Sequence, residues 1–185
     1  IAKIAHENEC TAHMDGARFF NASVSSNISP EIIARNYDSI SICLSKGLGA
    51  PIGSVLVGTN QFIETAHRWR KMFGGGMRQS GIIASAGIFA LENHIDLLKK
   101  DHIRAKILAE SINQLDDFSV NVENVETNMV YVHSRKNAHK ILDGLQKLGI
   151  DALSISPNAI RLVTHLHITD EDIERTISAF KAQCS

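Results

Sequence analysis

An apolar segment, residues 39–44, ends at Ser45 and Lys46, and three glycines and one proline follow within the next seven residues. A run this short, stopped by glycine and proline, is typical of a buried strand, so Lys46 is predicted to lie at a strand end. The small residues after it leave space for a bulky group. An amine drawn partly out of water at such a place becomes a nucleophile, because burial disfavours its charged form.

Asp15 follows a second short apolar stretch, residues 10–14. In open α/β sheets the carboxyl ends of the strands form the edge where ligands bind. An amine and a carboxylate at neighbouring strand ends suit pyridoxal phosphate (PLP), with Lys46 forming the Schiff base and Asp15 keeping the ring nitrogen protonated. From spacing alone, an ordinary ion pair between the two strand ends remains the alternative.

Three arginines are candidate anion ligands. Arg78 follows a run of three glycines before a predicted helix, which could form an anion site or a flexible break between helices. Arg161 lies inside an apolar strand, where an arginine suits a bidentate contact with a carboxylate, unless the strand is an edge strand facing water. Arg18 comes three residues after Asp15 and could face the same pocket or solvent.

Other motifs are weaker. The glycines of residues 47–53 differ from a dinucleotide-binding fingerprint, because the third glycine is one residue late and a strand follows. His165 and His167 would point the same way on a strand, but no acidic or cysteine partner lies at ligand spacing, so no metal is expected. Ser45 lacks the G-x-S-x-G context of an acyl-transfer nucleophile.

Composition sets the broad class. The chain has 185 residues, 44% of them hydrophobic and 21% charged, with a net charge of -1, as in ordinary globular proteins. This charge balance predicts neither nucleic acid nor an anionic membrane as a partner. No apolar segment approaches the roughly 20 residues that span a bilayer, and no signal-peptide pattern opens the chain. Three lone cysteines, Cys10, Cys43 and Cys184, favour a reducing compartment, so we expect a cytoplasmic protein.

Periodicity predicts two α/β domains of different character. Residues 1–93 read as the end of a large domain, with short apolar strands, a helix over 60–73 and a helix over 79–91 that is rich in small residues. The strand over 53–58 is expected to be buried on both faces, and the 79–91 helix is also expected to be buried. Residues 94–185 read as a small α+β domain. Its predicted helices cover 101–115, 137–148 and a segment opened by a capping-box-like Thr169-Asp170-Glu171-Asp172, and its predicted strands cover 118–122, 129–133, 153–155 and 160–163.

Taken together, these residues resemble the low-specificity L-threonine aldolases, which are PLP enzymes of fold type I. The resemblance is close at His13–Ala22, at Cys43–Ser54, and at Arg70-Lys71 with Gly74–Gln79. A weaker similarity continues through Asp101-His102 and Arg161–His165 to the end of the chain. It implies an α/β fold: the C-terminal part of a PLP fold-type-I large domain with a mostly parallel sheet, followed by a small C-terminal α+β domain.

The resemblance also implies roles for individual residues. Lys46 would be the Schiff-base lysine and Asp15 the partner of the pyridine nitrogen. Arg18 and Arg161 would hold the substrate carboxylate, and Arg18 and Arg78 would contribute to cofactor binding. Arg78 and Lys71 would form part of the active-site wall near a subunit boundary. The implied reaction is retro-aldol cleavage of L-threonine or L-allo-threonine to glycine and an aldehyde.

The subunits of that family are about twice as long as this chain. The resemblance therefore implies an upstream half, which carries the phosphate-binding loop, a histidine that stacks on the ring and the candidates for the catalytic base. It also implies a homo-oligomer, a dimer or tetramer, with the active site at the subunit interface. Two alternatives stay open: another PLP-dependent lyase or transaminase of the same fold, or a non-catalytic binding or assembly fragment that is inert without its front half.

Overall fold

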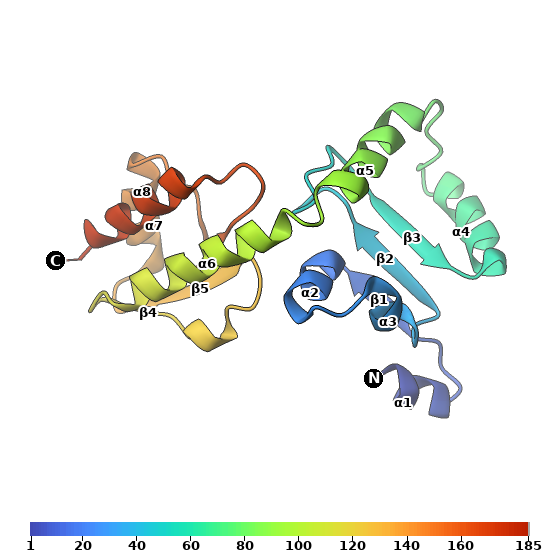
Figure 1. Ribbon diagram of the computed structural model, residues 1–185, viewed down its shortest axis with the longest axis horizontal. Helices are drawn as coiled ribbons and strands as arrows, with labels where there is room; N and C mark the ends of the chain where they lie inside the picture. Colours follow the sequence, from blue (N-terminus) through green and yellow to red (C-terminus); the bar gives the residue numbers. More distant parts are fainter. Residues whose placement is uncertain (185) are drawn as a thin grey trace. The chain divides into compact units, whose positions relative to one another are not determined.

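The structure is a computed structural model that describes residues 1–184. It divides into two compact units, Ile1–Asp96 and the residues from Leu97 onward, and each is described by itself (Figure 1). Among the described residues, no single helix combines the length and apolar composition needed to cross a membrane.

The N-terminal unit is built on a three-stranded sheet in the order β1-β2-β3. Strand β1 (His13–Gly16) runs parallel to β2 (Ser39–Cys43), while β3 (Ser54–Gly58) runs antiparallel to β2. Five helices accompany the sheet (Figure 1): α1 (Ala2–Glu7), α2 (Phe19–Ser26), α3 (Pro30–Ala34), α4 (Asn60–Met72) and α5 (Gly81–Asn93).

Two local features set the geometry of β1. A Cβ atom at Gly16 would lie 2.8 Å from the carbonyl oxygen of Ser41 and 3.2 Å from Cβ of Phe19, so only glycine lets α2 pack this close to the sheet. The backbone N–H of Ala12 donates to Oδ2 of Asp38 at 2.7 Å, and Nε2 of His6 donates to the same oxygen at 2.9 Å. These hydrogen bonds, that of Ala12 first, lower the pKa of Asp38.

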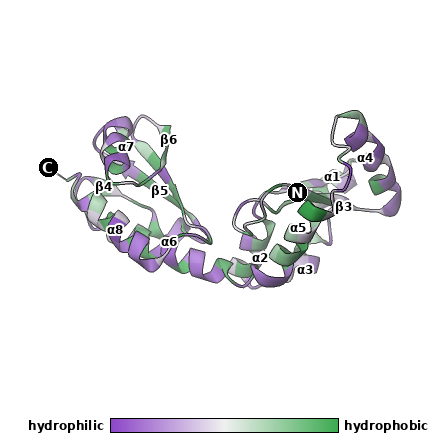
Figure 2. Ribbon diagram, turned by 90° about the horizontal axis from the view of Figure 1, so that it is seen from above, coloured by the Kyte–Doolittle hydropathy of each residue, from purple (hydrophilic) through white to green (hydrophobic). Residues whose placement is uncertain are grey.

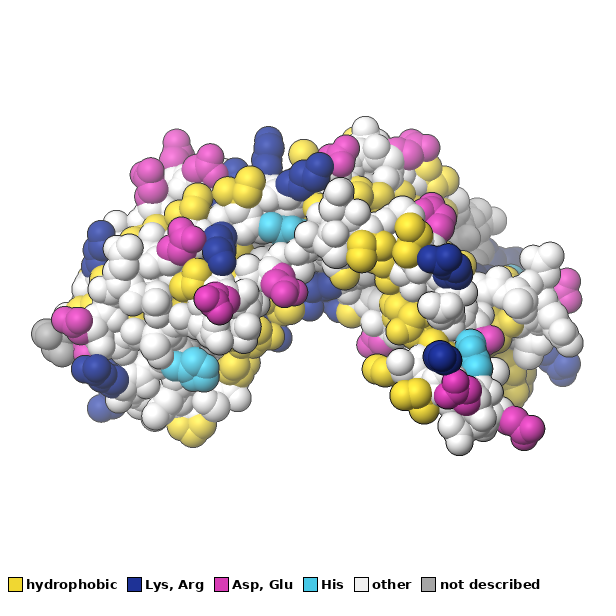
Figure 3. Space-filling view, turned by 60° about the horizontal axis from the view of Figure 1, so that its bottom comes forward, with side chains coloured by type: hydrophobic (Ala, Val, Ile, Leu, Met, Phe, Trp, Pro, Cys, Tyr) yellow, Lys and Arg dark blue, Asp and Glu magenta, His cyan; other side chains and the backbone are white. Residues whose placement is uncertain are grey.

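Two burial predictions for this unit are wrong for the chain as it stands. Leu56 and Val57, which point to opposite faces of β3, are 38% and 47% exposed, so both faces of this edge strand lie partly open. Helix α5 buries only Gly87 and Ala90, and Phe89 is 57% exposed. Figure 2 shows hydrophobic residues along α5, and Figure 3 shows hydrophobic side chains gathered on the surface of this unit (right).

The C-terminal unit is a four-stranded antiparallel sheet, β4-β5-β7-β6, packed against helices, as expected for a small α+β fold. Its strands are β4 (Phe118–Ser119), β5 (Met129–Ser134), β6 (Leu153–Ser156) and β7 (Ala159–Val163). Its helices are α6 (Leu98–Asn113), α7 (Ala138–Lys147), α8 (Asp170–Lys181) and the short 3-10 helix η1 (Val122–Asn124), which ends the predicted strand 118–122 early.

One hydrophobic core holds the sheet and helices of this unit together. Six of its large side chains are fully buried: Ile112, Val130, Val132, Leu145, Ile160 and Phe180. The rings of Phe118 and Phe180 meet edge to face with centroids 5.1 Å apart. The predicted capping box of α8 is confirmed: the N–H of Thr169 donates to Asp172, and the N–H of Asp172 donates to Thr169 Oγ1. The last helix therefore begins where the sequence indicates.

Candidate functional site

Asp15 and Lys46 are carried by neighbouring parallel strands. Asp15 lies in β1 in register with Ser41 of β2, and Lys46 follows the end of β2 by three residues (Figure 1). Both side chains are exposed, and within the described residues neither has a hydrogen-bond or ion-pair partner. The two residues thus do not form the ion pair that the spacing alone allowed, and both are free to bind a ligand.

The expectation that Lys46 is partly withdrawn from water is wrong within the described chain, because its side chain is exposed. The backbone around it is nevertheless well fixed. Leu44, Leu48 and Ala50 are buried, and the N–H of Ala50 donates to the carbonyl of Leu44 at 3.0 Å. The chain turns at Gly49, whose N–H donates to the carbonyl of Lys46 at 2.9 Å with a φ of 69° that favours glycine.

His94 anchors the same loop. Its Nδ1 donates to the carbonyl of Leu48 at 2.6 Å, which ties the end of α5 to the turn after Lys46. The ring of His94 also meets Phe89 edge to face, with centroids 5.4 Å apart. Sequence reasoning assigned His94 no role, and nothing local points to one, because its partner lies 46 positions earlier.

Arg18 and Arg161 share an unusual feature. Each is half-buried, and the Nε atom of each is buried without a hydrogen-bond partner in the described part of the chain. A buried N–H without an acceptor is costly, and a carboxylate or phosphate would satisfy it with a charge-assisted bond. Both arginines therefore fit anion binding, in two separate units of the chain.

The elements explain where these arginines lie. Arg18 directly precedes α2, two residues after the end of the strand that carries Asp15. Arg161 lies in β7, an inner strand, with Tyr131 of β5 and Leu153 of β6 directly opposite it. The alternative that Arg161 sits on an edge strand is therefore wrong.

Lys71 lies in the last turn of α4 and Arg78 in the stretch between α4 and α5, and both side chains are exposed. The helix α4 ends before the glycine run, and the N–H of Gly75 closes it by donating to the carbonyl of Arg70 at 2.8 Å. The segment thus leaves Arg78 accessible, and its role in binding an anion stays a prediction.

A pocket of about 540 Å³ lies in the N-terminal unit, and none of the candidate site residues is among those that line it. It is lined by Ser41 and Leu56 of the sheet and by His67 and Arg70 of α4. Asp15, Ser41 and Leu56 form one row across β1, β2 and β3, so the pocket opens on the sheet face that carries Asp15.

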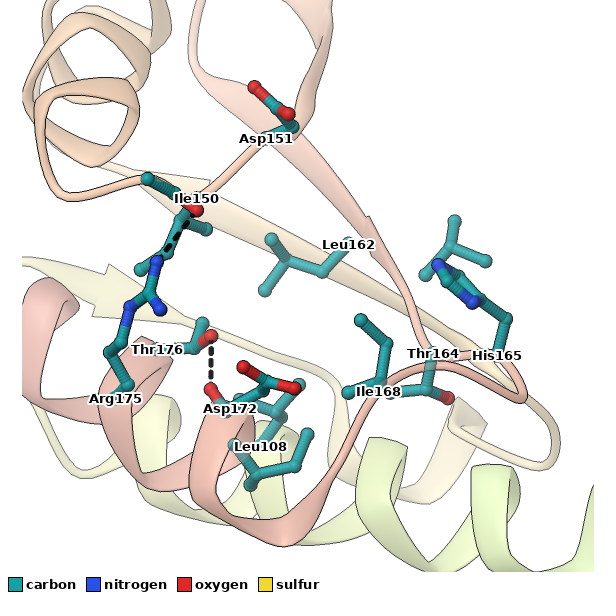
Figure 4. Close-up of a pocket in the computed structure, with 13 residues that line it drawn as sticks. Leu108, Ile150, Asp151, Leu162, Thr164, His165, Ile168, Asp172, Arg175 and Thr176 are labelled. Carbon is teal, nitrogen blue, oxygen red and sulfur yellow. Dashed lines mark hydrogen bonds between the residues drawn. The ribbon is translucent and has the colours of Figure 1, made fainter.

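The C-terminal unit has its own pocket of about 290 Å³ (Figure 4). Leu108, Leu162 and Ile168 contribute apolar side chains to its lining. Two of its charged groups are already engaged: Nη2 of Arg175 donates to the carbonyls of Leu148 and Gly149 at 3.0 and 2.9 Å, and Asp172 takes part in the capping box. This pocket therefore offers an anion fewer free donors than the two arginines above.

The histidines singled out in the sequence do come together. The rings of His165 and His167 lie edge to face, with centroids 5.7 Å apart. Among residues 1–184, no group of three His, Cys, Asp or Glu side chains is arranged to hold a metal ion.

Comparison with solved structures defines the fold. The chain superposes on a putative aromatic amino acid beta-eliminating lyase/threonine aldolase from Exiguobacterium sp. 255-15 with a TM-score of 0.82 and 24% identity, covering 98% of this chain and 55% of that one. It superposes on the threonine aldolase of Leishmania major with a TM-score of 0.81 and 18% identity, covering 100% and 55%. The chain has the predicted α/β fold of part of a PLP fold-type-I enzyme.

Sequence comparison gives the family. The family described as beta-eliminating lyase matches residues 1–135, and the chain belongs to this family. Low-specificity L-threonine aldolase 1 of Arabidopsis thaliana is 42% identical over 185 residues, covering 98% of this chain and 52% of that protein. The low specificity L-threonine aldolase of Escherichia coli K12 is 42% identical over 180 residues, covering 97% and 53%. The predicted resemblance is confirmed, and the chain spans about half the length of these relatives.

Proposed function

We propose that this chain is part of a PLP-dependent aldolase that cleaves L-threonine or L-allo-threonine to glycine and an aldehyde. The observation that carries the proposal is the pair of buried, unpaired Nε atoms of Arg18 and Arg161, which suits an anionic amino-acid substrate and an anionic cofactor. The named relatives at about 40% identity support the same reaction.

The residues of the N-terminal unit fit PLP. The exposed amine of Lys46 is free to bind the aldehyde carbon of the cofactor, and the free carboxylate of Asp15 is suited to hold a proton on the ring nitrogen. Arg18 and Arg78 would add positive charge for its phosphate or for the substrate. When bound, PLP supplies an electron sink for the electrons of a broken bond at the substrate Cα.

The chain's own residues then act on the substrate. Arg161 would bind the substrate carboxylate and so fix the amino acid, while the carboxylate of Asp15 would stabilise the proton on the ring nitrogen of the cofactor. A base removes the β-hydroxyl proton, the Cα–Cβ bond breaks and the aldehyde leaves, and Cα takes up a proton to give glycine. The substrate amine would take the place of the Lys46 amine at the cofactor on binding, and the Lys46 amine would return to that place at the end and so release glycine. A side chain acts as this base only if it lies within hydrogen-bond reach of the β-hydroxyl.

A second candidate is another PLP-dependent lyase or transaminase of the same fold, and the match to the beta-eliminating lyase family favours it. Such an enzyme would use Asp15 and Lys46 in the same way. Assaying threonine beside β-substituted amino acids separates the two: glycine with an aldehyde marks the aldolase, and pyruvate with ammonia marks a β-elimination.

We also propose what covers the open surface of the N-terminal unit. Large apolar side chains of β3 and α5 are exposed there, and the relatives are about twice as long as this chain. A segment equivalent to the rest of those relatives would bury this surface and complete the site in a homo-oligomer. The three free cysteines, Cys10, Cys43 and Cys184, fit a reducing compartment such as the cytoplasm.

The proposal is tested in the whole subunit that contains this chain. Wild type is expected to release glycine and acetaldehyde from L-threonine in the presence of PLP, and Lys46→Ala is expected to reduce glycine formation to background. Lys147→Ala, which removes an exposed lysine of α7, is the matched control and should keep wild-type rates. Glycine formation by Lys46→Ala at the wild-type rate would remove Lys46 from the mechanism.

A further inference from the structure

Three buried polar residues meet where the C-terminal unit begins. Asp101, Asn128 and Thr164 are each 2% exposed, although they come from three different elements. Asp101 lies in the first turn of α6, Asn128 immediately precedes β5, and Thr164 immediately follows β7. We call these residues the Thr164 cluster.

Thr164 makes hydrogen bonds in three directions within this cluster. Its hydroxyl donates to the main-chain carbonyl of Asp101 at 2.7 Å, and its backbone N–H donates to the carbonyl of Asn128 at 3.0 Å. Its own carbonyl accepts from Nδ2 of Asn128 at 2.8 Å. The end of β7 is thus held both to the start of β5 and to the first turn of α6.

Burying the polar groups of the Thr164 cluster lowers the stability of the folded unit. Oδ1 of Asn128 is buried and has no donor among residues 1–184, and burial raises the pKa of the Asp101 carboxyl. An unsatisfied buried acceptor costs stability, whereas the adjacent pair in the same ladder, Val130 and Leu162, fills the core with apolar groups. A buried polar network of this kind specifies one geometry at the expense of stability.

The strand held by this cluster is the one that carries Arg161, three residues before Thr164. The direction of a side chain on a strand depends on the register and twist of that strand. Arg161 stands between Tyr131 and Leu153, and its Nε is buried without a partner, so a small rotation of β7 changes where its planar fork of donors points.

We propose that the hydroxyl of Thr164, through Asp101 and Asn128, is a positioning group for the carboxylate-binding fork of Arg161. This rests on the proposed function, because it assigns Arg161 to the carboxylate of the amino-acid substrate. Thr164 itself does not touch the substrate. It fixes the strand end so that Arg161 presents two parallel N–H groups to the carboxylate.

The experiment uses the whole PLP-loaded subunit and the near-isosteric change Thr164→Val, which removes only the hydroxyl donor. We expect the KM for L-threonine to rise at least about fivefold with kcat within about twofold of wild type, since a bond made equally in ground and transition states affects KM. Thr164→Ser, which restores the donor, should return KM to within about twofold of wild type. The affinity for 1-amino-2-propanol, which is threonine without its carboxylate, should not change.

Thr176→Val is the matched control. The Thr176 hydroxyl donates to the carbonyl of Asp172 at 2.7 Å in the same unit, but it is not bonded to β7. This variant should lose stability and keep the wild-type KM. If Thr164→Val does not fold, Thr164→Cys takes its place with the same expected order, because a thiol is a weak donor.

Three results would overturn the inference: an unchanged KM in the Thr164 variant, an equal rise in KM in Thr176→Val, or equal weakening of threonine and its carboxylate-free analogue. Arg161→Lys separates this inference from the proposed function. If Arg161→Lys raises KM and Thr164→Val does not, only the positioning role fails. If Arg161→Lys leaves KM unchanged, the assignment of Arg161 itself fails.

Discussion

Arg161 offers the sharpest test of the site, because its burial predicts opposite effects on binding and on stability. Replacing it with lysine keeps the charge but removes the planar fork, and with it one of two hydrogen bonds to a carboxylate. A hydrogen bond to a charged group contributes about 1.5–3 kcal/mol, and about 1.4 kcal/mol is a factor of ten. The KM for L-threonine should therefore rise about 10- to 150-fold in Arg161→Lys.

Replacing Arg161 should not lower the stability of the ligand-free protein. The Nε of Arg161 is buried without an acceptor in the described chain, so the ligand-free protein already bears the cost of an unsatisfied donor. Arg161→Met removes that donor and keeps a long flexible side chain between Tyr131 and Leu153. Its free energy of unfolding without substrate should be unchanged or higher, by at most about 1–3 kcal/mol.

Two measurements on the whole subunit test these predictions for binding and for stability. Initial rates of aldehyde release over a range of L-threonine concentrations give kcat and KM, and urea unfolding followed by far-UV circular dichroism gives stability. Arg135→Lys, at an exposed arginine that follows β5, is the control and should match wild type in both. A wild-type KM in both Arg161 variants, or a large loss of stability in Arg161→Met, would refute the reasoning.

Three further outcomes are expected. Asp15→Ala should keep PLP bound but slow turnover by about 10²–10⁴-fold, the range for a positioned proton-holding group, and a near-normal rate would contradict its role. Leu145→Ala, at a fully buried core position of α7, should lower the free energy of unfolding by about 2–5 kcal/mol in urea, and a loss below about 1 kcal/mol would show that the core there is loosely packed. Folding lowers the pKa of Asp38, through the N–H of Ala12 and then through His6. The Asp38 carboxylate therefore stabilises the folded protein at pH values above its unfolded pKa of about 3.8, and this stabilisation is lost as the pH falls through the lower pKa of the folded state. Unfolding between pH 3 and 7 should therefore show wild type losing its advantage over Asp38→Asn in acid, and a pH-independent difference would show that this carboxylate is not linked to folding.

The amino-acid sequence by itself determined the features that depend on near neighbours in the chain. The amphipathic helices α4 and α7, the capping box of Thr169 and Asp172, and the strand that ends before Lys46 all follow from periodicity, caps and glycines within a few residues. Helix α2 does not follow from such local signals, and it packs closely against the sheet at Gly16. The motifs around Asp15 and Lys46 also pointed to the family that the comparisons confirm.

Only the tertiary structure decided which faces are covered and which distant residues meet. The apolar run of β3 reads as buried, yet burial depends on what packs over a strand, and both faces of this edge strand lie partly open. His94 reaches Leu48 across 46 positions, and Thr164 reaches Asp101 across 63. Such contacts leave no local pattern in the sequence, because chain folding alone brings the partners together. The loop after Lys46 and the strand of Arg161 are both held in this way.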